Sequence, residues 1–155
     1  MNQKQRILAA GVAAACTWMA NADAAGTSTV TVTASVTGKC TFNTATSSMP
    51  TITVDPSAAG PFTGTQGVLF KCTAGTTSTM TLSSQSTSSG TGGNLTLSTN
   101  TLAYSYSNTG GSQAGTGFGS GQDKTLNVSV TITAANAANA PAGTYTDTIN
   151  VTVAP

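Results

Sequence analysis

Few side chains in this sequence could do chemistry, and the cysteines stand out among them. The chain has three cysteines but no histidine and no glutamate, so its acidic residues are all aspartates. The missing histidine removes the commonest general base and the commonest metal ligand. The aspartates are scattered along the sequence, so we also expect no catalysis by a pair of carboxylates. We therefore expect that this protein is not an enzyme and that it has no catalytic residue, no metal site and no cofactor. The aspartates are Asp23, Asp55, Asp123 and Asp147.

Serine and threonine make up about a third of the chain, with 17 Ser and 32 Thr among 155 residues. A hydroxyl nucleophile would have to be activated by a lysine or an isolated aspartate, which is a weak basis for catalysis. The chain has 5 basic and 4 acidic residues and a formal net charge of +1. Too few lysines follow the N-terminal region to form a basic patch, so we expect no nucleic-acid partner. No pattern indicates a small-molecule substrate.

The first residues have the features of an export signal. Lys4 and Arg6 precede an uncharged, mostly apolar run at 7–20, and small residues follow it. This run is too short to span a bilayer and is typical of a secretory signal peptide. We predict a signal at 1–24 with cleavage after Ala24; cleavage after Ala22 also fits an A-x-A site. Lipidation of Cys16 is an alternative, although the residue three positions before it is alanine.

Removal of the signal leaves one pair of cysteines, Cys40 and Cys72. An even number of cysteines in an exported chain predicts a disulfide. Closing a loop of about 33 residues would stabilise the fold by about 3–4 kcal/mol in the chain-entropy model. A metal site is a poorer explanation, because two cysteines without histidine supply too few ligands.

The rest of the chain alternates between apolar and hydroxyl residues, which is the period of a strand with one buried face. Connections rich in Gly, Ser, Thr and Asn separate these segments, and the longest, at 108–121, is expected to be a flexible hairpin connection. Many short strands in one domain predict an all-β, antiparallel, immunoglobulin-like sandwich. The expected strands lie in segments 30–42, 52–54, 68–72, 80–82, 95–97, 102–106, 126–132 and 145–153.

The first and the last segment of the alternating pattern indicate a subunit that assembles with further copies of itself. The uncharged segment 25–37 carries its apolar side chains on one face, and the last expected strand ends two residues before the sequence does. No later strand of the sequence could pair with the free edge of that last strand. These features suggest donor-strand complementation, in which the N-terminal strand of one subunit fills the gap in the next. The alternative is an N-terminal strand that folds into its own sandwich. The proposed donor residues are Val30, Val32, Ala34 and Val36, and the proposed acceptor groove is floored by Ile149, Val151 and Val153.

Several short motifs make the mature sequence similar to a known family. They are Lys39-Cys40-Thr41-Phe42, Asp55-Pro56, Phe70-Lys71-Cys72 and the C-terminal Pro141-Ala142-Gly143-Thr144-Tyr145-Thr146-Asp147-Thr148-Ile149. With these motifs the sequence resembles the spore coat protein U domain family over nearly all of 25–155. That family includes the major pilins of archaic, Csu-type chaperone–usher pili.

The resemblance implies an incomplete immunoglobulin-like pilin that lacks its final strand and is completed by donor-strand exchange. It implies a donor strand at 25–37, a pilin-like sandwich at 38–155 and a structural disulfide between Cys40 and Cys72. The implied partners are a periplasmic chaperone, an outer-membrane usher and further copies of the chain in a head-to-tail polymer. The resemblance implies that this polymer is a surface fimbria that supports adhesion and biofilm formation. A spore or cell-surface coat is the alternative that the family name records.

Two further sets of residues carry predictions of their own. Asp147 shares its face with Tyr145 and Ile149, so we expect its carboxylate to point inward at the rim and to accept from loop N–H groups. A contact with the chaperone is the alternative for Asp147. Tyr104, Tyr106 and Tyr145 are expected to be half-buried strand residues. A carbohydrate-binding module would instead need exposed coplanar aromatic rings, and no tryptophan remains after residue 18.

Overall fold

The computed structural model describes residues 26–155. This part of the chain contains seven strands and one short helix, and its residues 35–155 form one compact unit, separate from the unit that holds 26–34. The elements are β1 (Cys40–Phe42), β2 (Phe62–Cys72), β3 (Thr79–Ser84), β4 (Gly92–Leu97), β5 (Asn100–Thr109), β6 (Lys124–Ile132), α1 (Ala134–Ala137) and β7 (Ile149–Ala154).

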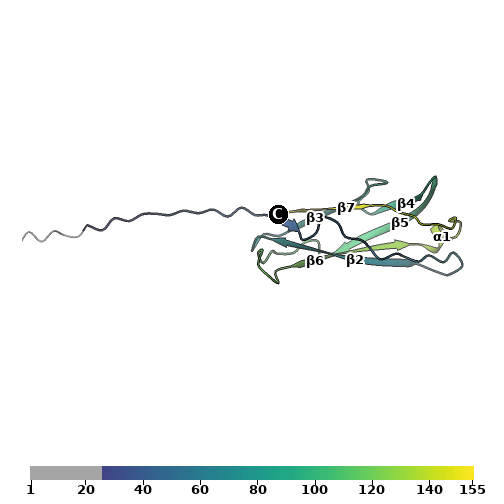
Figure 1. The fold of residues 1–155 in the computed structure, drawn as a ribbon, viewed down its shortest axis with the longest axis horizontal. Helices are drawn as coiled ribbons and strands as arrows, with labels where there is room; N and C mark the ends of the chain where they lie inside the picture. The colour runs from purple at the N-terminus through teal and green to yellow at the C-terminus, as the bar shows by residue number, and fades with distance from the viewer. Residues whose placement is uncertain (1–25) are drawn as a thin grey trace, which may run out of the picture. The chain divides into compact units, whose positions relative to one another are not determined.

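The strands form two antiparallel sheets. Five of them lie in the order β1-β2-β6-β5-β4, and the other two, β3 and β7, form a smaller sheet. Figure 1 shows β3 and β7 in one layer and β2 and β6 in the other. Two layers of antiparallel strands confirm the predicted all-β, immunoglobulin-like sandwich.

Alternating side chains explain why these segments are strands. In β6, every second residue from Leu126 to Ile132 is buried, and the residues between them carry hydroxyl or amide groups that face outward. The same pattern in β5 buries Leu102, Tyr104 and Tyr106. Together with the fully buried Phe70 of β2, these side chains fill the space between the sheets.

The sandwich has two ends, which we name by what they hold. We call the end that holds Cys40, Cys72 and the start of β6 the disulfide end. The opposite end, where β6 finishes and α1 begins, is the helix end. A Cβ on Gly38, two residues before Cys40, would lie 3.6 Å from Pro155 Cβ, just after β7. β7 therefore runs from the helix end to the disulfide end.

Three of the predicted strand segments differ clearly from the structure. Of the segment 30–42, only Cys40–Phe42 forms a strand, and 52–54 forms none. Ile52 and Val54 are nevertheless half-buried against the core, and a Cβ on Gly64 of β2 would lie 2.7 Å from Ile52 Cγ1. Ile52 and Val54 thus point inward as expected, although residues 52–54 form no strand. The last strand is also shorter than expected and begins at Ile149.

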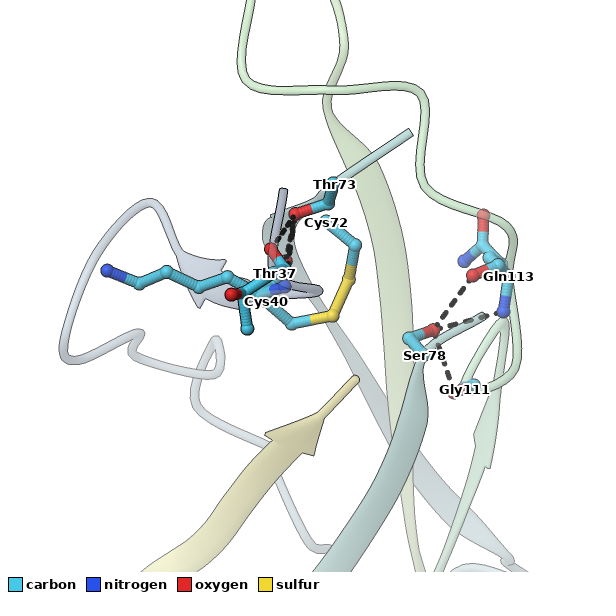
Figure 2. Close-up of a disulfide and its surroundings, with 8 residues drawn as sticks. Thr37, Cys40, Cys72, Thr73, Ser78, Gly111 and Gln113 are labelled. Atoms are coloured by element: carbon cyan, nitrogen blue, oxygen red, sulfur yellow. Dashed lines mark hydrogen bonds between the residues drawn. A yellow bond between two sulfur atoms is a disulfide. The ribbon is translucent and has the colours of Figure 1, made fainter. Parts of the chain in front are cut away.

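The glycine-rich loop connects β5 and β6, which pair as a hairpin as predicted, but the loop is packed against the domain. The Gly115 N–H donates to Thr76 O at 2.8 Å, and the Gly117 N–H donates to Cys72 O at 3.0 Å. A Cβ on Gly115 would lie 2.4 Å from Thr73 O, so only glycine permits this approach. The fully buried Ser78 hydroxyl also donates to Gln113 O at 3.2 Å (Figure 2).

Candidate functional site

The outer edge of β7 is the first component of the candidate site. β7 pairs with β3 along its whole length, and within residues 26–155 no strand pairs with its other edge. We call this edge, over Ile149–Ala154, the acceptor edge. Ile149, Val151 and Val153 face inward and are half-buried, so these predicted groove residues remain partly open to solvent.

The second component is residues 26–37, which we call the N-terminal segment. The described chain from 26 to 39 forms no helix or strand. Val30, Val32 and Val36 are 83%, 86% and 84% exposed, and Ala34 is exposed as well. A row of exposed aliphatic side chains on an uncharged extended segment is an aggregation hazard unless a partner covers it.

The joint between the N-terminal segment and the sandwich is fixed beside the disulfide. Cys40 and Cys72 lie directly opposite each other on β1 and β2 and are bonded, which confirms the predicted disulfide (Figure 2). The Lys39 N–H donates to Thr73 Oγ1 at 3.0 Å, and the Thr73 N–H donates to Lys39 O at 2.9 Å. The Thr73 hydroxyl in turn donates to the carbonyl oxygens of Lys39 and Thr37 at 3.3 and 3.4 Å.

The same joint lies next to the end of β7. A Cβ on Gly38 would be 3.6 Å from Pro155 Cβ and 3.2 Å from Thr76 Oγ1. The chain therefore enters the sandwich at the disulfide end, where the acceptor edge finishes. The other end of the acceptor edge, at Ile149, lies at the helix end.

A hydrogen-bonded carboxylate anchors the chain just before β7. Asp147 Oδ2 accepts from Ser84 Oγ at 2.7 Å, from Ser86 Oγ at 2.8 Å and from Tyr104 Oη at 2.8 Å. Its Oδ1 accepts from the Thr148 N–H at 2.8 Å. The carboxylate points inward as predicted, but most of its donors are side-chain hydroxyls instead of loop N–H groups. It thereby ties the start of the acceptor edge to β3 and β5.

The hydrogen-bonded cluster around Asp147 occupies the space that a side chain at position 93 of β4 would need, and Gly93 has none. A Cβ on Gly93 would lie 2.8 Å from Asp147 Oδ2 and would overlap the Ser84 hydroxyl. The sequence alone did not identify Gly93, Ser84 or Ser86 as partners of Asp147. Serine and threonine are so common in this chain that no single hydroxyl residue stands out from the others.

Similarity to known proteins identifies the family of this domain. Residues 26–152 match the family model of the Spore Coat Protein U domain. The chain belongs to this family. The comparisons with curated proteins and with solved structures found no match.

Membership in the Spore Coat Protein U domain family supports a structural surface protein of the pilin or coat type. Two observations on residues 26–155 bear on other classes of site. No three His, Cys, Asp or Glu residues gather there in a way that could hold a metal ion. None of the helices in this range is long and apolar enough to cross a membrane.

The aromatic residues of this Spore Coat Protein U domain do not form a sugar platform. Tyr104 and Tyr106 are only 5% and 6% exposed, more deeply buried than predicted, and their rings pack with centroids 6.0 Å apart. Tyr145 is half-buried, and its hydroxyl donates to Pro141 O at 2.9 Å. Among the described residues, Phe118 alone presents an exposed aromatic ring.

Replacing Asp147 by asparagine is expected to destabilise the domain and to make its free energy of unfolding less dependent on pH in the acid range. Burial raises the pKa of Asp147, but the hydrogen bonds from Ser84, Ser86, Tyr104 and the Thr148 N–H outweigh this effect and lower the pKa overall. A lowered pKa means that the stabilisation is present above the ordinary carboxyl pKa of about 4 and is lost as the pH falls through the lowered value. The expected loss near neutral pH is about 1–3 kcal/mol.

Urea unfolding of the Asp147→Asn variant between pH 2 and 7 measures this effect. Asp55→Asn is the matched control, because the Asp55 carboxylate is exposed and its pKa is lowered only by the hydroxyl and N–H of Ser57. We expect the control to change the free energy of unfolding far less at neutral pH. Equal effects of the two substitutions would refute the anchoring role of Asp147.

Proposed function

We propose that this protein is the structural subunit of an extracellular fibre that polymerises by donor-strand exchange, as in archaic chaperone–usher pili. The proposed fibre supports surface adhesion and biofilm formation. One observation carries the proposal: within residues 26–155, one edge of β7 is unpaired while the same chain exposes an alternating aliphatic segment. A strand added at such an edge gains main-chain hydrogen bonds as well as side-chain burial.

The direction of the strands favours exchange between molecules. The chain enters its sandwich at the disulfide end, where its own β7 finishes. If it folded back beside its own β7, the N-terminal segment would have to run parallel to that strand. A segment from another copy can instead run antiparallel to β7, with Val36 at the helix end of the acceptor. The donor's domain then lies beyond that helix end, so the contact is head-to-tail and repeats as a fibre.

The spacing of the side chains suggests a register. In an antiparallel pair, inward-facing residues lie opposite inward-facing residues. Placing Val32, Ala34 and Val36 opposite Val153, Val151 and Ile149 satisfies this rule. A shift by two residues toward the helix end would instead place Val36 opposite Asp147, whose carboxylate is already hydrogen-bonded. Each buried valine contributes about 1.5–3 kcal/mol before the cost of ordering the segment.

This assembly route sets the proposed partners and locations. The signal at 1–24, which lies outside the described residues, would direct the chain through the periplasm. A periplasmic chaperone would cover the acceptor edge until an outer-membrane usher exchanges it for the N-terminal segment of the next subunit. The fibre would then stand on the cell surface. A coat built by the same strand exchange is the second candidate, and the family description favours it.

A self-complemented variant tests the proposal directly. Residues 26–37 are deleted and the sequence 27–37 is attached after Pro155 through a short turn, so that it can run antiparallel to β7 as a hairpin. We expect a soluble monomer that is more stable than the same deletion without the attached segment. The matched control carries aspartate in place of Val30, Val32 and Val36 in the attached copy, and it should show no gain.

The full-length chain provides the second half of the test. Expressed with a chaperone in a periplasm, it should give a ladder on gels of unboiled samples that collapses on boiling. A chain that remains monomeric, together with an attached segment that gives no stabilisation, would refute strand exchange. If the ladder forms, electron microscopy distinguishes thin fibres from a continuous coat.

A further inference from the structure

Two large apolar side chains remain exposed on the sandwich itself. Within residues 37–155, Leu69 and Phe118 are the exposed large hydrophobic residues, at 43% and 47% exposure. Leu69 lies on the outer face of β2, two residues before Lys71. The Lys71 ammonium donates to Gly119 O at 3.0 Å, which places the Phe118 loop beside this end of β2. We call Leu69 and Phe118 the apolar pair.

Phe118 is presented by a loop with a defined conformation. Gly117 on one side has a φ of +112° and its N–H donates to Cys72 O at 3.0 Å. On the other side, Asp123 lies 3.6 Å from Lys71 Nζ. Holding the loop at both sides of Phe118 lowers the entropic cost of using this ring as an anchor. An exposed ring on a fixed support is typical of a contact residue.

The apolar pair lies at the disulfide end, which faces the preceding subunit in the proposed fibre. In the register proposed for the donor strand, Val36 ends at Ile149 of the acceptor, and only residues 37–39 separate it from β1 of its own domain. Three extended residues span about 10 Å. This distance brings the disulfide end of one domain close to the helix end of the other.

The helix end offers a surface that suits an apolar partner. The segment 134–142 contains six alanines and one proline but no charged residue. Ala135, Ala138, Pro141 and Ala142 are exposed on it. Small side chains let an aromatic ring approach closely, and no charge on this segment would have to be desolvated.

We propose that the apolar pair, and Phe118 above all, packs on the 134–142 segment of a second copy of this chain at each junction of the fibre. The inference rests on the proposed function, because strand exchange brings the two surfaces together. The contact adds burial outside the donor strand and limits the rotation of one domain on the next. Phe118 is thus an assembly residue at a position remote from the acceptor edge.

Site-specific cross-linking tests the junction. Phe118 is replaced by the photo-reactive analogue benzoylphenylalanine, the chain is assembled in the periplasm, and the polymer is irradiated and then boiled. We expect covalent dimers whose cross-linked peptide includes the 134–142 segment. The same analogue at Thr65, an exposed residue in the middle of β2, is the matched control and should give no such dimer.

The outcomes separate this inference from the proposed function. A boiling-sensitive ladder without cross-links to 134–142 would refute the junction contact but leave strand exchange standing. Absence of a ladder from the unsubstituted chain would refute the proposed function, and the junction with it. If the analogue at Phe118 blocks folding, it is placed at Ala138 instead, where cross-links to the loop around Phe118 support the contact and their absence refutes it.

Discussion

Replacing Val32 by aspartate is expected to abolish the boiling-sensitive polymer while leaving the domain folded. Val32 is 86% exposed in the single chain, so the substitution should change the stability of the monomer by no more than about 0.5 kcal/mol. In the polymer, the same position would be buried opposite the inner face of β7. Burying an unpaired carboxylate there costs several kcal/mol, which corresponds to an affinity at least about 100-fold lower.

Thr31→Asp is the matched control because the alternation places residue 31 on the opposite face of the segment. Both substitutions add the same charge, one residue apart, so electrostatic and expression effects are equal to a first approximation. The ladder on gels of unboiled periplasmic extracts should survive in the control and be lost in the Val32→Asp variant. Survival of both ladders would contradict insertion of this face, and loss of both would point to charge alone.

The acceptor side should respond in the same way, but it cannot give so clean an experiment. Val151 is half-buried in the single chain and packs against the core. Its replacement by aspartate would therefore destabilise the domain as well as the polymer. The donor substitution is the better test because the folded domain does not depend on the side chain that is changed.

Alternation predicted the fold well where each strand has both a buried face and a neighbouring strand. The segments around Phe70, Leu82, Tyr104 and Val130 all became strands, because the pattern of the side chains and the main-chain pairing agree there. At Ile52 the pattern was short, and the side chain does point inward, but residues 52–54 form no strand. Periodicity reports which face is buried, whereas a strand also needs a hydrogen-bonding partner.

The candidate site was predictable to a similar extent. The exposed valines and the alternating last strand are visible in the sequence because they form runs. The partners of Asp147 are not, since Ser84 and Ser86 lie more than 60 residues away in a chain that is rich in hydroxyl groups. The packing of Gly115 against Thr73 is also invisible in the sequence, because many glycines follow one another in that loop.

Replacing both Cys40 and Cys72 by serine is expected to destabilise the domain more than the Asp147→Asn substitution does. The disulfide closes a loop with a sequence separation of 32 residues, and the chain-entropy model assigns such a loop about 3–4 kcal/mol. For a domain of this size, that loss lowers the Tm by about 10–15 °C. Thermal unfolding of the self-complemented monomer, followed by circular dichroism, measures the change.

The effect should concentrate at the joint between the N-terminal segment and the sandwich. β1 has only three residues, so the disulfide and the contacts of Thr73 with Lys39 are what hold it on β2. Without the disulfide, we expect fast amide hydrogen exchange in β1 while β6, at the centre of the larger sheet, stays protected. Reductant should lower the Tm of the parent but leave the double-serine variant unchanged. A double-serine variant with the parent's Tm would show that the bond adds no stability.

A loosened joint would also change assembly, because it determines where the N-terminal segment leaves the domain. With β1 detached, the connection between the donor strand and its own sandwich lengthens from residues 37–39 to a segment that reaches β2 at Phe62. The donor strand could still insert, since its valines are untouched. The domain of the donor chain, however, would no longer be held against the helix end of the acceptor. We therefore expect the double-serine variant to form shorter polymers, seen as shorter ladders on gels. Its junctions should also be flexible, which electron microscopy of the fibres measures as a wider spread of angles between successive domains.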